Sequence, residues 1–311
     1  MRVLVVTNIY PAARSPFQGV FVYEQVQELR KFCDVHVVHV GRPRWIGYIV
    51  GIPAMAIGLL AHRPNVVHVH YGLTGLSAIP AVPLIWAMKA RLLTTLHGSD
   101  ILGRSRTVKT ISHLLSRLSD CVVAVSQEIA RKVRPFNPKV HWIPCGVDEA
   151  FYSSARDRTK RTVFVFPADP RRGVKNYEMF ERAVAEFERL TGIVAETTVL
   201  SGMTRSQVRH TLSAATALVM TSRWEGSPQV VKEALAANLP VISTPVGDVP
   251  SLIDGVPYCA VATEPREFAA RMAEANEAPH EVDLRSAVEQ YSGSQVAKRL
   301  YAVYQQCCWS H

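Results

Sequence analysis

The sequence predicts two α/β units, each built on a doubly wound parallel sheet with helices on both faces. Short runs of β-branched and aliphatic residues alternate with amphipathic stretches along the whole chain, which is typical of buried parallel strands joined by helices. A polar, charged stretch at residues 153–161 interrupts this alternation. The chain has 311 residues, more than one core of this kind usually fills.

The first unit is assigned to residues 1–150. Its expected strands are 2–7, 34–40, 65–70, 92–96, 120–125 and 139–143. A helix is expected at residues 20–32, after a loop that contains Gly19, and Ser126 is expected to cap a further helix. His68 alternates with valines inside a strand and is expected in the core.

The second unit is assigned to residues 162–292, after a linker at residues 151–161. Its expected strands are 162–166, 195–200, 217–220 and 240–243, and its expected helices are 176–191, 204–215 and 228–237. A last helix lies within residues 293–311, with apolar residues at helical spacing. Ligands of doubly wound sheets lie outside the carboxyl ends of the strands, so residues that follow strands are the candidates for function.

Charge and cysteine content restrict the class of protein. The formal net charge is +9, which suits a phosphorylated substrate, an anionic membrane surface or nucleic acid. Nucleic acid is disfavoured, because lysine-rich runs and interleaved aromatic and basic residues are absent. The six cysteines show no metal-type spacing, so we expect reduced thiols in a cytoplasmic protein.

The apolar stretch at residues 45–62 allows two interpretations. It is at the short limit for a membrane span, and three glycines and a proline interrupt it. It is either a helix packed within the first unit or a patch that rests on the inner face of the membrane. In the second case Arg42, Arg44 and Arg63 would lie at the lipid headgroups.

The most informative motif is Glu225-Gly-Ser-Pro-Gln-Val-Val-Lys-Glu233, between two predicted strands. Ser227 is expected as the helix N-cap, Pro228 as the first helical residue, and Asn238 as a left-handed helix end. The helix start would point its amides at a diphosphate. Glu233 would lie about 7–8 Å along the axis, within reach of a ribose. The alternative is a pair of solvated glutamates on an amphipathic helix.

Together with residues 240–248 (Pro-Val-Ile-Ser-Thr-Pro-Val-Gly-Asp), this motif resembles the signature of retaining glycosyltransferase family 4. The likeness covers nearly the whole chain, including Thr7-Asn-Ile-Tyr-Pro11, His97-Gly-Ser-Asp100 and residues 166–175. The chain departs from the family at Cys145, where asparagine is common. Similar enzymes build bacterial envelope polysaccharides.

The resemblance implies the GT-B fold, in which two Rossmann-like domains face each other across a cleft. Residues 293–311 would then cross back to the first domain. The second domain would bind a UDP- or GDP-linked sugar as donor substrate, and the first a hydroxyl acceptor. No cofactor is expected. Metal is not expected either, because the sequence contains no Asp-x-Asp motif. The family retains anomeric configuration, by front-face attack or with Glu225 as a covalent nucleophile.

Resemblance and position at strand ends together give three groups of site residues. The catalytic group is His97, Arg171, Lys175 and Glu225. The donor-binding group is Gly19, Arg172, Gly226, Ser227, Pro228, Gln229, Val230 and Glu233. The acceptor-binding group is His70, Tyr71 and Asp100. The spacing from arginine to lysine is one residue longer than the family's usual form, which leaves open whether Arg171 or Arg172 binds the diphosphate.

The expected activity is transfer of a hexose or amino-hexose to a glycan, a lipid-linked acceptor or a small molecule. Two alternatives remain at this point. One is a GT-B nucleotide-sugar epimerase, which would form product without an acceptor. The other is a non-catalytic, membrane-associated protein that binds nucleotide sugars.

Overall fold

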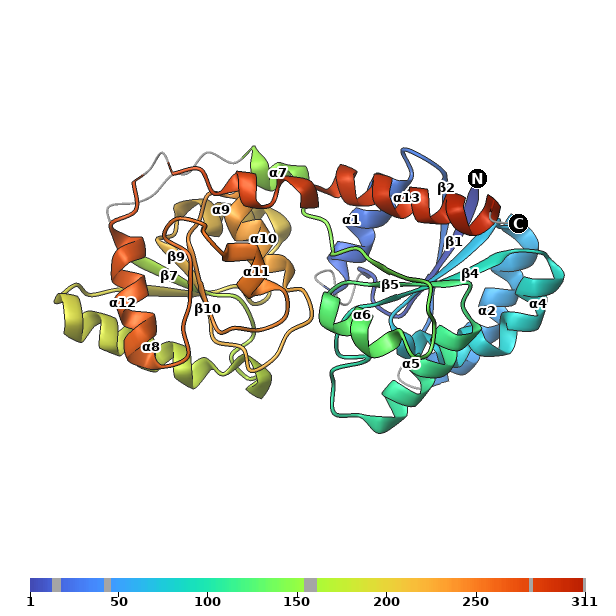
Figure 1. Ribbon diagram of the computed structural model, residues 1–311, viewed down its shortest axis with the longest axis horizontal. Helices are drawn as coiled ribbons and strands as arrows, with labels where there is room; N and C mark the ends of the chain where they lie inside the picture. The colour runs from blue at the N-terminus through green and yellow to red at the C-terminus, as the bar shows by residue number, and fades with distance from the viewer. Residues whose placement is uncertain (13–17, 42–45, 154–160, 280–281, 310–311) are drawn as a thin grey trace. The chain divides into compact units, whose positions relative to one another are not determined.

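The computed structural model describes residues 1–311 except 13–17, 42–45, 154–160, 280–281 and 310–311. The chain forms two compact units (Figure 1). Unit 1 comprises Met1–Gly146 and Gly293–His311, and unit 2 comprises Val147–Ser292. Most of the linker expected at residues 151–161, together with Arg42, Arg44 and Trp45, lies outside the described residues.

Unit 1 contains a sheet of six parallel strands in the order β2-β1-β3-β4-β5-β6. The strands are β1 (Arg2–Thr7), β2 (Asp34–His39), β3 (Val66–His70), β4 (Arg91–Leu96), β5 (Cys121–Ala124) and β6 (Val140–Trp142). The strand order reverses between β1 and β3, where Thr7 pairs with His70. The loops after these strands therefore open at the position where doubly wound folds bind ligands.

Helices cover both faces of this sheet (Figure 1). One face packs against α1 (Val20–Leu29) and α13 (Gly293–Trp309). The other face carries α2 (Ile46–His62), α3 (Gly75–Ala78), α4 (Val82–Ala87), α5 (Arg106–Leu118) and α6 (Gln127–Val133), with short 3-10 turns at Gly72–Thr74 and Ile79–Ala81. Because α13 supplies Val296, Leu300 and Tyr304 to this core, the chain's last helix stabilises unit 1.

Unit 2 contains a parallel sheet in the order β11-β10-β9-β7-β8. The strands are β7 (Val163–Phe166), β8 (Glu196–Val199), β9 (Ala217–Met220), β10 (Val241–Ser243) and β11 (Ala260–Val261). The helices are α7 (Glu149–Tyr152), α8 (Tyr177–Thr191), α9 (Arg205–Ala214), α10 (Gln229–Ala236), α11 (Val249–Ile253) and α12 (Pro265–Asn276), and 3-10 turns lie at Gly173–Lys175, Arg285–Ala287 and Glu289–Tyr291. The order reverses between β7 and β9.

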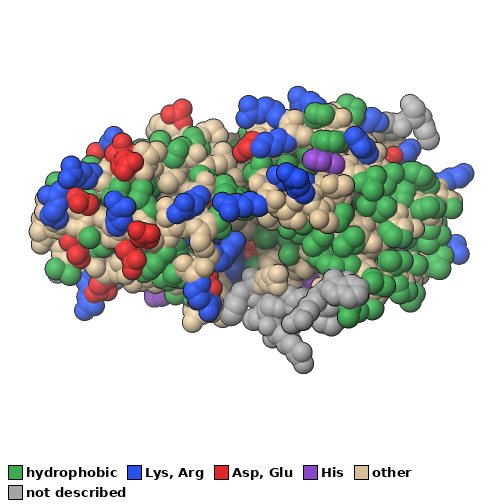
Figure 2. Space-filling view, turned by 90° about the horizontal axis from the view of Figure 1, so that it is seen from below, with side chains coloured by type: hydrophobic (Ala, Val, Ile, Leu, Met, Phe, Trp, Pro, Cys, Tyr) green, Lys and Arg blue, Asp and Glu red, His purple; other side chains and the backbone are tan. Residues whose placement is uncertain are grey.

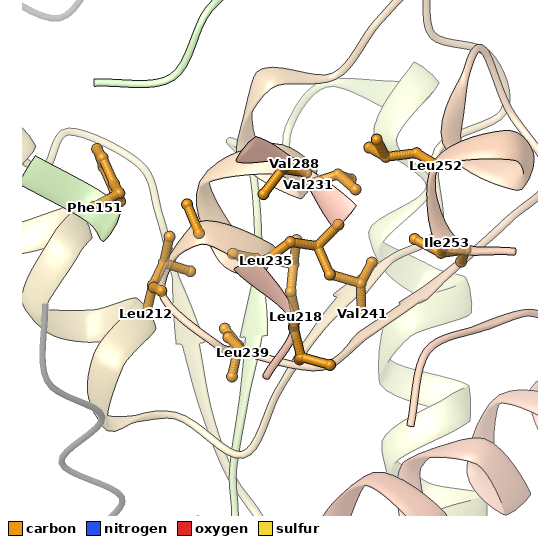
Figure 3. Close-up of a cluster of buried hydrophobic side chains, with 14 of the residues drawn as sticks. Phe151, Leu212, Leu218, Val231, Leu235, Leu239, Val241, Leu252, Ile253 and Val288 are labelled. Carbon is orange, nitrogen blue, oxygen red and sulfur yellow. The ribbon is translucent and has the colours of Figure 1, made fainter. Parts of the chain in front are cut away.

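Helix α10 is fixed by the largest core cluster of unit 2. Figure 3 shows Val231 and Leu235 of this helix among Leu218 and Val241 from the sheet and Leu252 from α11. All but Leu252 are fully inaccessible to solvent. Truncating a side chain such as Leu235 to alanine would cost about 2–5 kcal/mol. The start of α10 is therefore held rigidly against the carboxyl edge of the sheet.

The fold class predicted from the sequence is confirmed, with two parallel sheets covered by helices. Ser126 caps α6 as predicted, since its hydroxyl accepts a hydrogen bond from the Ile129 amide at 3.3 Å. Asn238 adopts the predicted left-handed conformation, with φ of 58°. Among the described residues, no helix is both long and apolar enough to cross a membrane.

The predicted start of α10 is wrong in detail. The helix begins at Gln229, Pro228 occupies the N-cap position, and no side chain caps it. Ser227 does not cap the helix, because its hydroxyl donates a hydrogen bond to the Asp248 carboxylate at 2.6 Å and accepts one from Lys232. A charged buried pair competes better for this hydroxyl than a neutral helix amide does.

Candidate functional site

Lys175 and Glu225 meet at the reversal point of the unit 2 sheet. Lys175 lies in the loop after β7, and Glu225 lies in the loop after β9. The Lys175 ammonium donates a hydrogen bond to Glu225 Oε1, and both side chains are about 85% buried, with 14% and 15% of their surfaces exposed. The structure thus brings together two residues that the sequence places 50 positions apart.

Hydrogen bonds from Thr221 and Arg223 to backbone carbonyls tie these two loops together. The Thr221 hydroxyl reaches the carbonyls of Lys175 at 3.1 Å and Asn176 at 2.9 Å. The Arg223 amide donates to the Val174 carbonyl at 2.8 Å. Because these bonds fix the loop of Lys175 to the end of β9, the ammonium is held in place before any substrate binds.

Glu233 lies on α10 with only 3% of its surface exposed. Its carboxylate accepts a hydrogen bond from Arg205 at 2.7 Å. Arg205 is the first residue of α9, and its guanidinium stacks over the Phe151 ring at 4.7 Å from the centroid. A guanidinium held this way orients the carboxylate, because its hydrogen bond and its contact with the Phe151 ring restrict both side chains.

A buried ion pair between Lys232 and Asp248 lies next to the Gly226–Ser227 turn. Lys232 is fully buried, and its ammonium lies 3.6 Å from the Asp248 carboxylate and also donates to Ser227. Gly247 has φ of 59°, and a Cβ there would lie 2.5 Å from the Gly226 carbonyl oxygen. Both the ion pair and the close backbone contact therefore set the shape of the Gly226–Ser227 turn.

Replacing Asp248 by alanine is expected to destabilise unit 2 by about 3 kcal/mol, because it removes the carboxylate paired with a buried lysine, which keeps the neutral Ser227 hydroxyl and the face of the Tyr291 ring as partners. Urea unfolding would measure the loss. Lys232→Met in the same background should restore most of it, since the uncompensated charge is then gone. Arg271→Ala, which breaks an exposed pair with Glu274, should leave the unfolding curve almost unchanged. Equal midpoints for Asp248→Ala and the unsubstituted chain would refute this role.

The structure distinguishes the two arginines before Lys175. Arg171 is turned toward Asp169, with Nε 3.0 Å from Oδ1 and Nη2 2.8 Å from Oδ2. This guanidinium lowers the pKa of Asp169 to about 2. Arg172 is exposed and immediately precedes the turn that carries Lys175. Among the described residues, Arg171 is ion-paired with Asp169, whereas Arg172 forms no ion pair with a carboxylate and acts on Asp169 only through its charge.

Three histidine rings contact one another in a row from the middle of β3 to the end of β4 in unit 1. His68 is buried and contacts Tyr304 Oη and Thr95 Oγ1, each at 2.6 Å, which confirms its predicted place in the core. His70 Nδ1 lies 3.1 Å from His97 Nε2. His97 Nδ1 lies 3.8 Å from Cys145 Sγ. A substrate contact by His97 would therefore replace one of these partners.

Asp100 fixes the loop that carries His97. It is fully buried, and its carboxylate accepts hydrogen bonds from the amides of His97 at 2.9 Å, Gly98 at 2.8 Å and Gly72 at 3.3 Å. Burial raises the pKa of Asp100, and these amides oppose that rise. In this geometry Asp100 positions His97, and the acceptor contact expected for Asp100 stays a prediction.

Tyr71 and Gly19 occupy neighbouring strand ends. The half-buried Tyr71 accepts a hydrogen bond from the Ser99 hydroxyl at 3.2 Å and has φ of 71°. Gly19 caps α1 with φ of 71°, and a Cβ there would lie 2.3 Å from the Ile9 carbonyl. The backbone that requires glycine here is thus the chain's own, and a donor contact by Gly19 stays a prediction.

The buried histidines make the stability of unit 1 depend on pH. Burial lowers the pKa of His68 from 6.5 to about 3, and that of His70 well below 6.5. At a pH below 6.5 and above the lowered pKa of each ring, the histidine is protonated in the unfolded chain but neutral in the folded chain. The stability that these neutral rings contribute is therefore complete above pH 6.5 and falls as the pH is lowered, by about 2 kcal/mol for His68 between pH 7.5 and 5, and His70 adds to the fall in the same direction.

Thermal unfolding between pH 7.5 and 5 measures this loss of stability. His68→Gln should remove the part of the loss that His68 causes. A midpoint that does not change between pH 7.5 and 5 would contradict the assignment of neutral rings.

Comparison with known families now adds to this geometry. Residues 3–151 match the protein family described as Glycosyltransferase Family 4. Residues 161–277 match the family described as Glycosyl transferases group 1. The two matches together span most of both units. The chain belongs to the family 4-like glycosyltransferases.

Two curated relatives illustrate the range of this glycosyltransferase's neighbours. The putative teichuronic acid biosynthesis glycosyltransferase TuaC of Bacillus subtilis is 27% identical, over 81% of this chain and 83% of TuaC. The α-maltose-1-phosphate synthase of Mycolicibacterium smegmatis is also 27% identical, over 88% of this chain and 89% of the synthase.

Solved structures confirm that the glycosyltransferase has the GT-B fold. Sucrose-phosphate synthase from Thermosynechococcus elongatus superposes with a TM-score of 0.78 at 16% identity, covering 98% of this chain and 99% of that one. HepE of Anabaena, in complex with UDP and glucose, gives a TM-score of 0.74 at 13% identity, with 98% and 99% covered.

Sequence reasoning missed three residues of the glycosyltransferase's candidate site: Arg205, Lys232 and Asp248. Arg205 and Asp248 each follow a strand of unit 2, so the rule that located Lys175 and Glu225 could have found them. Lys232 lies in the middle of the quoted motif and looks like a solvated helix residue in sequence. Within the described part of the chain, no cluster of three His, Cys, Asp or Glu side chains could hold a metal ion.

Proposed function

We propose that this glycosyltransferase moves a hexose or amino-hexose from a UDP- or GDP-sugar to a hydroxyl acceptor, with retention of configuration and without a metal ion. The observation that carries the proposal is the Lys175–Glu225 pair at the reversal point of unit 2, beside the helix that holds buried Glu233. Cationic, acidic and helix-start groups lie within one part of one unit, as a sugar diphosphate requires.

Unit 2 is assigned the donor. The Glu233 carboxylate would accept hydrogen bonds from the ribose hydroxyls, with Arg205 holding it at 2.7 Å. The start of α10, at Gly226, Ser227, Pro228, Gln229 and Val230, would receive the diphosphate. The HepE structures, solved with UDP and with UDP-glucose, support a nucleotide sugar as the donor class.

The proposed reaction breaks the bond between the sugar C1 and the diphosphate oxygen. The acceptor hydroxyl oxygen bonds to C1 on the face from which the diphosphate leaves, and its proton passes to the leaving oxygen. Lys175 and Arg172 stabilise the negative charge that develops there, a task that a metal ion performs in other enzymes. Glu225, now paired with Lys175, would turn to the sugar hydroxyls once the ammonium binds phosphate.

Unit 1 is assigned the acceptor. His70, Tyr71 and His97 lie at the carboxyl ends of β3 and β4, next to the reversal of strand order. Burial lowers the pKa of His97 to about 3, so its ring is neutral at pH 7. A neutral imidazole both donates and accepts hydrogen bonds, which suits recognition of sugar hydroxyls.

A donor panel tests the proposal. The chain is incubated with UDP- and GDP-hexoses and amino-hexoses without acceptor, and release of free sugar is followed by mass spectrometry. We expect slow hydrolysis of one donor class, unchanged by a chelator. Proton NMR of a product formed with an added acceptor should show the donor's anomeric configuration.

Variants make this result specific. Hydrolysis should fall strongly in Lys175→Ala and Glu233→Ala, and remain normal in Arg189→Ala, an exposed residue paired with Glu186 on α8. Conversion of the donor into its epimer would contradict the proposal and show that the protein is an epimerase. Donor binding without turnover, with or without acceptors, would favour a non-catalytic binding protein.

A further inference from the structure

The outer face of α2 is entirely apolar. This 17-residue helix contains no lysine, arginine, aspartate or glutamate. Its exposed residues recur at helical spacing and form one stripe: Ile46, Ile49, Val50, Pro53, Ile57 and Leu60. Between 49% and 66% of the surface of each isoleucine, valine and leucine in the stripe is exposed. Helices on the surface of soluble domains normally present polar residues at these positions.

The helix cannot turn this stripe inward. Its opposite face buries Met55 and Leu59 against the sheet. Gly51 and Gly58 allow the close approach, because a Cβ at Gly51 would lie 2.8 Å from Val40 and one at Gly58 would lie 3.0 Å from Val38. Since the two glycines and the buried Met55 and Leu59 share the face that packs on the sheet, the stripe on the opposite face points outward.

Neighbouring elements enlarge this apolar surface. Helix α2 packs against α3 and the turn Ile79–Ala81. Leu76 on α3 is 41% exposed, and Trp86 on α4 is 54% exposed. Figure 2 shows a broad field of hydrophobic side chains on this part of unit 1, with lysine and arginine side chains at its margins. A continuous apolar field on a soluble domain marks an interaction surface.

The charge of the chain indicates what covers this surface. Unit 1 has nineteen lysines and arginines against six acidic residues, a net charge of +13, whereas unit 2 has sixteen against twenty, a net charge of −4. Residues 35–119, which contain α2 to α5, have nine basic residues and one acidic residue, the fully buried Asp100. The unit that exposes the apolar field therefore carries the whole positive excess.

We propose that unit 1 docks on an anionic phospholipid bilayer, with α2 lying in the interface and its stripe between the headgroups. Apolar side chains gain free energy by leaving water, and cations near the bilayer are attracted to the anionic surface. Arg63, directly after α2, and the exposed Lys89, after α4, supply such charge. A second copy fits less well, because two units of +13 would repel each other.

Vesicle flotation tests this docking. The chain is mixed at low salt with phosphatidylcholine vesicles that do or do not contain one third phosphatidylglycerol. We expect binding to the anionic vesicles, weaker binding to the neutral ones, and release by high salt. Ile57→Gln with Leu60→Gln should weaken binding at least about tenfold by removing buried apolar area. Arg63→Gln with Lys89→Gln should weaken it about fivefold per charge, on anionic vesicles only.

The matched control lies in unit 2, where Leu190 and Val194 are 56% and 84% exposed. Leu190→Gln with Val194→Gln should float like the unsubstituted chain, and circular dichroism should show that all variants are folded. Three outcomes would overturn the proposal. The first is no flotation at low salt. The second is equal vesicle binding by the double variant on α2 and the double variant in unit 2. The third is a dimer, seen by light scattering, that only the double substitution on α2 dissociates.

Discussion

Replacing Lys175 by alanine is expected to lower kcat about a thousandfold while changing the affinity for the donor little. The ammonium is held at the reversal point of the unit 2 sheet by Glu225 and by the bonds that tie its loop to β9. Its proposed task arises as the sugar–phosphate bond breaks and charge develops on the diphosphate. Loss of one fixed donor to such charge raises the barrier by about 4 kcal/mol.

Steady-state kinetics with the identified donor, together with calorimetry of donor binding, would measure both quantities. Lys132→Ala is the matched control, because Lys132 is also paired with a glutamate at 3.0 Å but is exposed on α6. Lys175→Arg should recover part of the rate, since it restores a cation at a different reach. If Lys175→Ala weakened donor binding and left kcat unchanged, Lys175 would be a binding residue only.

Replacing Glu233 by alanine is expected to weaken binding of the nucleoside diphosphate about a thousandfold. Two hydrogen bonds from ribose hydroxyls to a charged carboxylate would be lost, worth about 1.5–3 kcal/mol each. The loss should be seen equally for UDP or GDP alone and for the complete sugar nucleotide, because the ribose is common to both. Isothermal calorimetry with the free diphosphate measures it without any requirement for catalysis.

Arg205→Ala should reduce the affinity less than Glu233→Ala, because Arg205 only orients the carboxylate, through the 2.7 Å bond. Glu196→Ala is the matched control: Glu196 is likewise a glutamate of unit 2 paired with an arginine, Arg161, at 2.9 Å, but it is about half exposed. Full affinity in Glu233→Ala, with wild-type stoichiometry, would remove Glu233 from the site.

The sheets and the positions of the main site residues were predictable from sequence, since both depend on local patterns. Continuous apolar runs gave strands such as β3 and β9 nearly to the residue. The rule that ligands lie at strand ends pointed to Lys175, Glu225 and His97. None of these inferences required knowledge of which distant side chains meet.

The features that the sequence did not predict depend on contacts between residues that are far apart in the chain. The hydroxyl of Ser227 was expected to cap α10, but Asp248, twenty-one residues later, takes it. Arg205 contacts Glu233, which is 28 residues away in the sequence, and no local sequence pattern predicts this pair. Similarly, the outward stripe of α2 follows from how Gly51 and Gly58 fit against β2 and its flank, which only the packed structure reveals.

The central claim is that unit 2 holds the nucleoside diphosphate of an activated sugar at the start of α10. The most direct measurement is a crystal structure of the chain soaked with UDP, or with GDP if calorimetry selects it. The account predicts the ribose hydroxyls within hydrogen-bond distance of the Glu233 carboxylate and the diphosphate against the Gly226–Ser227 turn, near Lys175. A nucleotide bound at the strand ends of unit 1, with the surroundings of Glu233 unchanged, would contradict it.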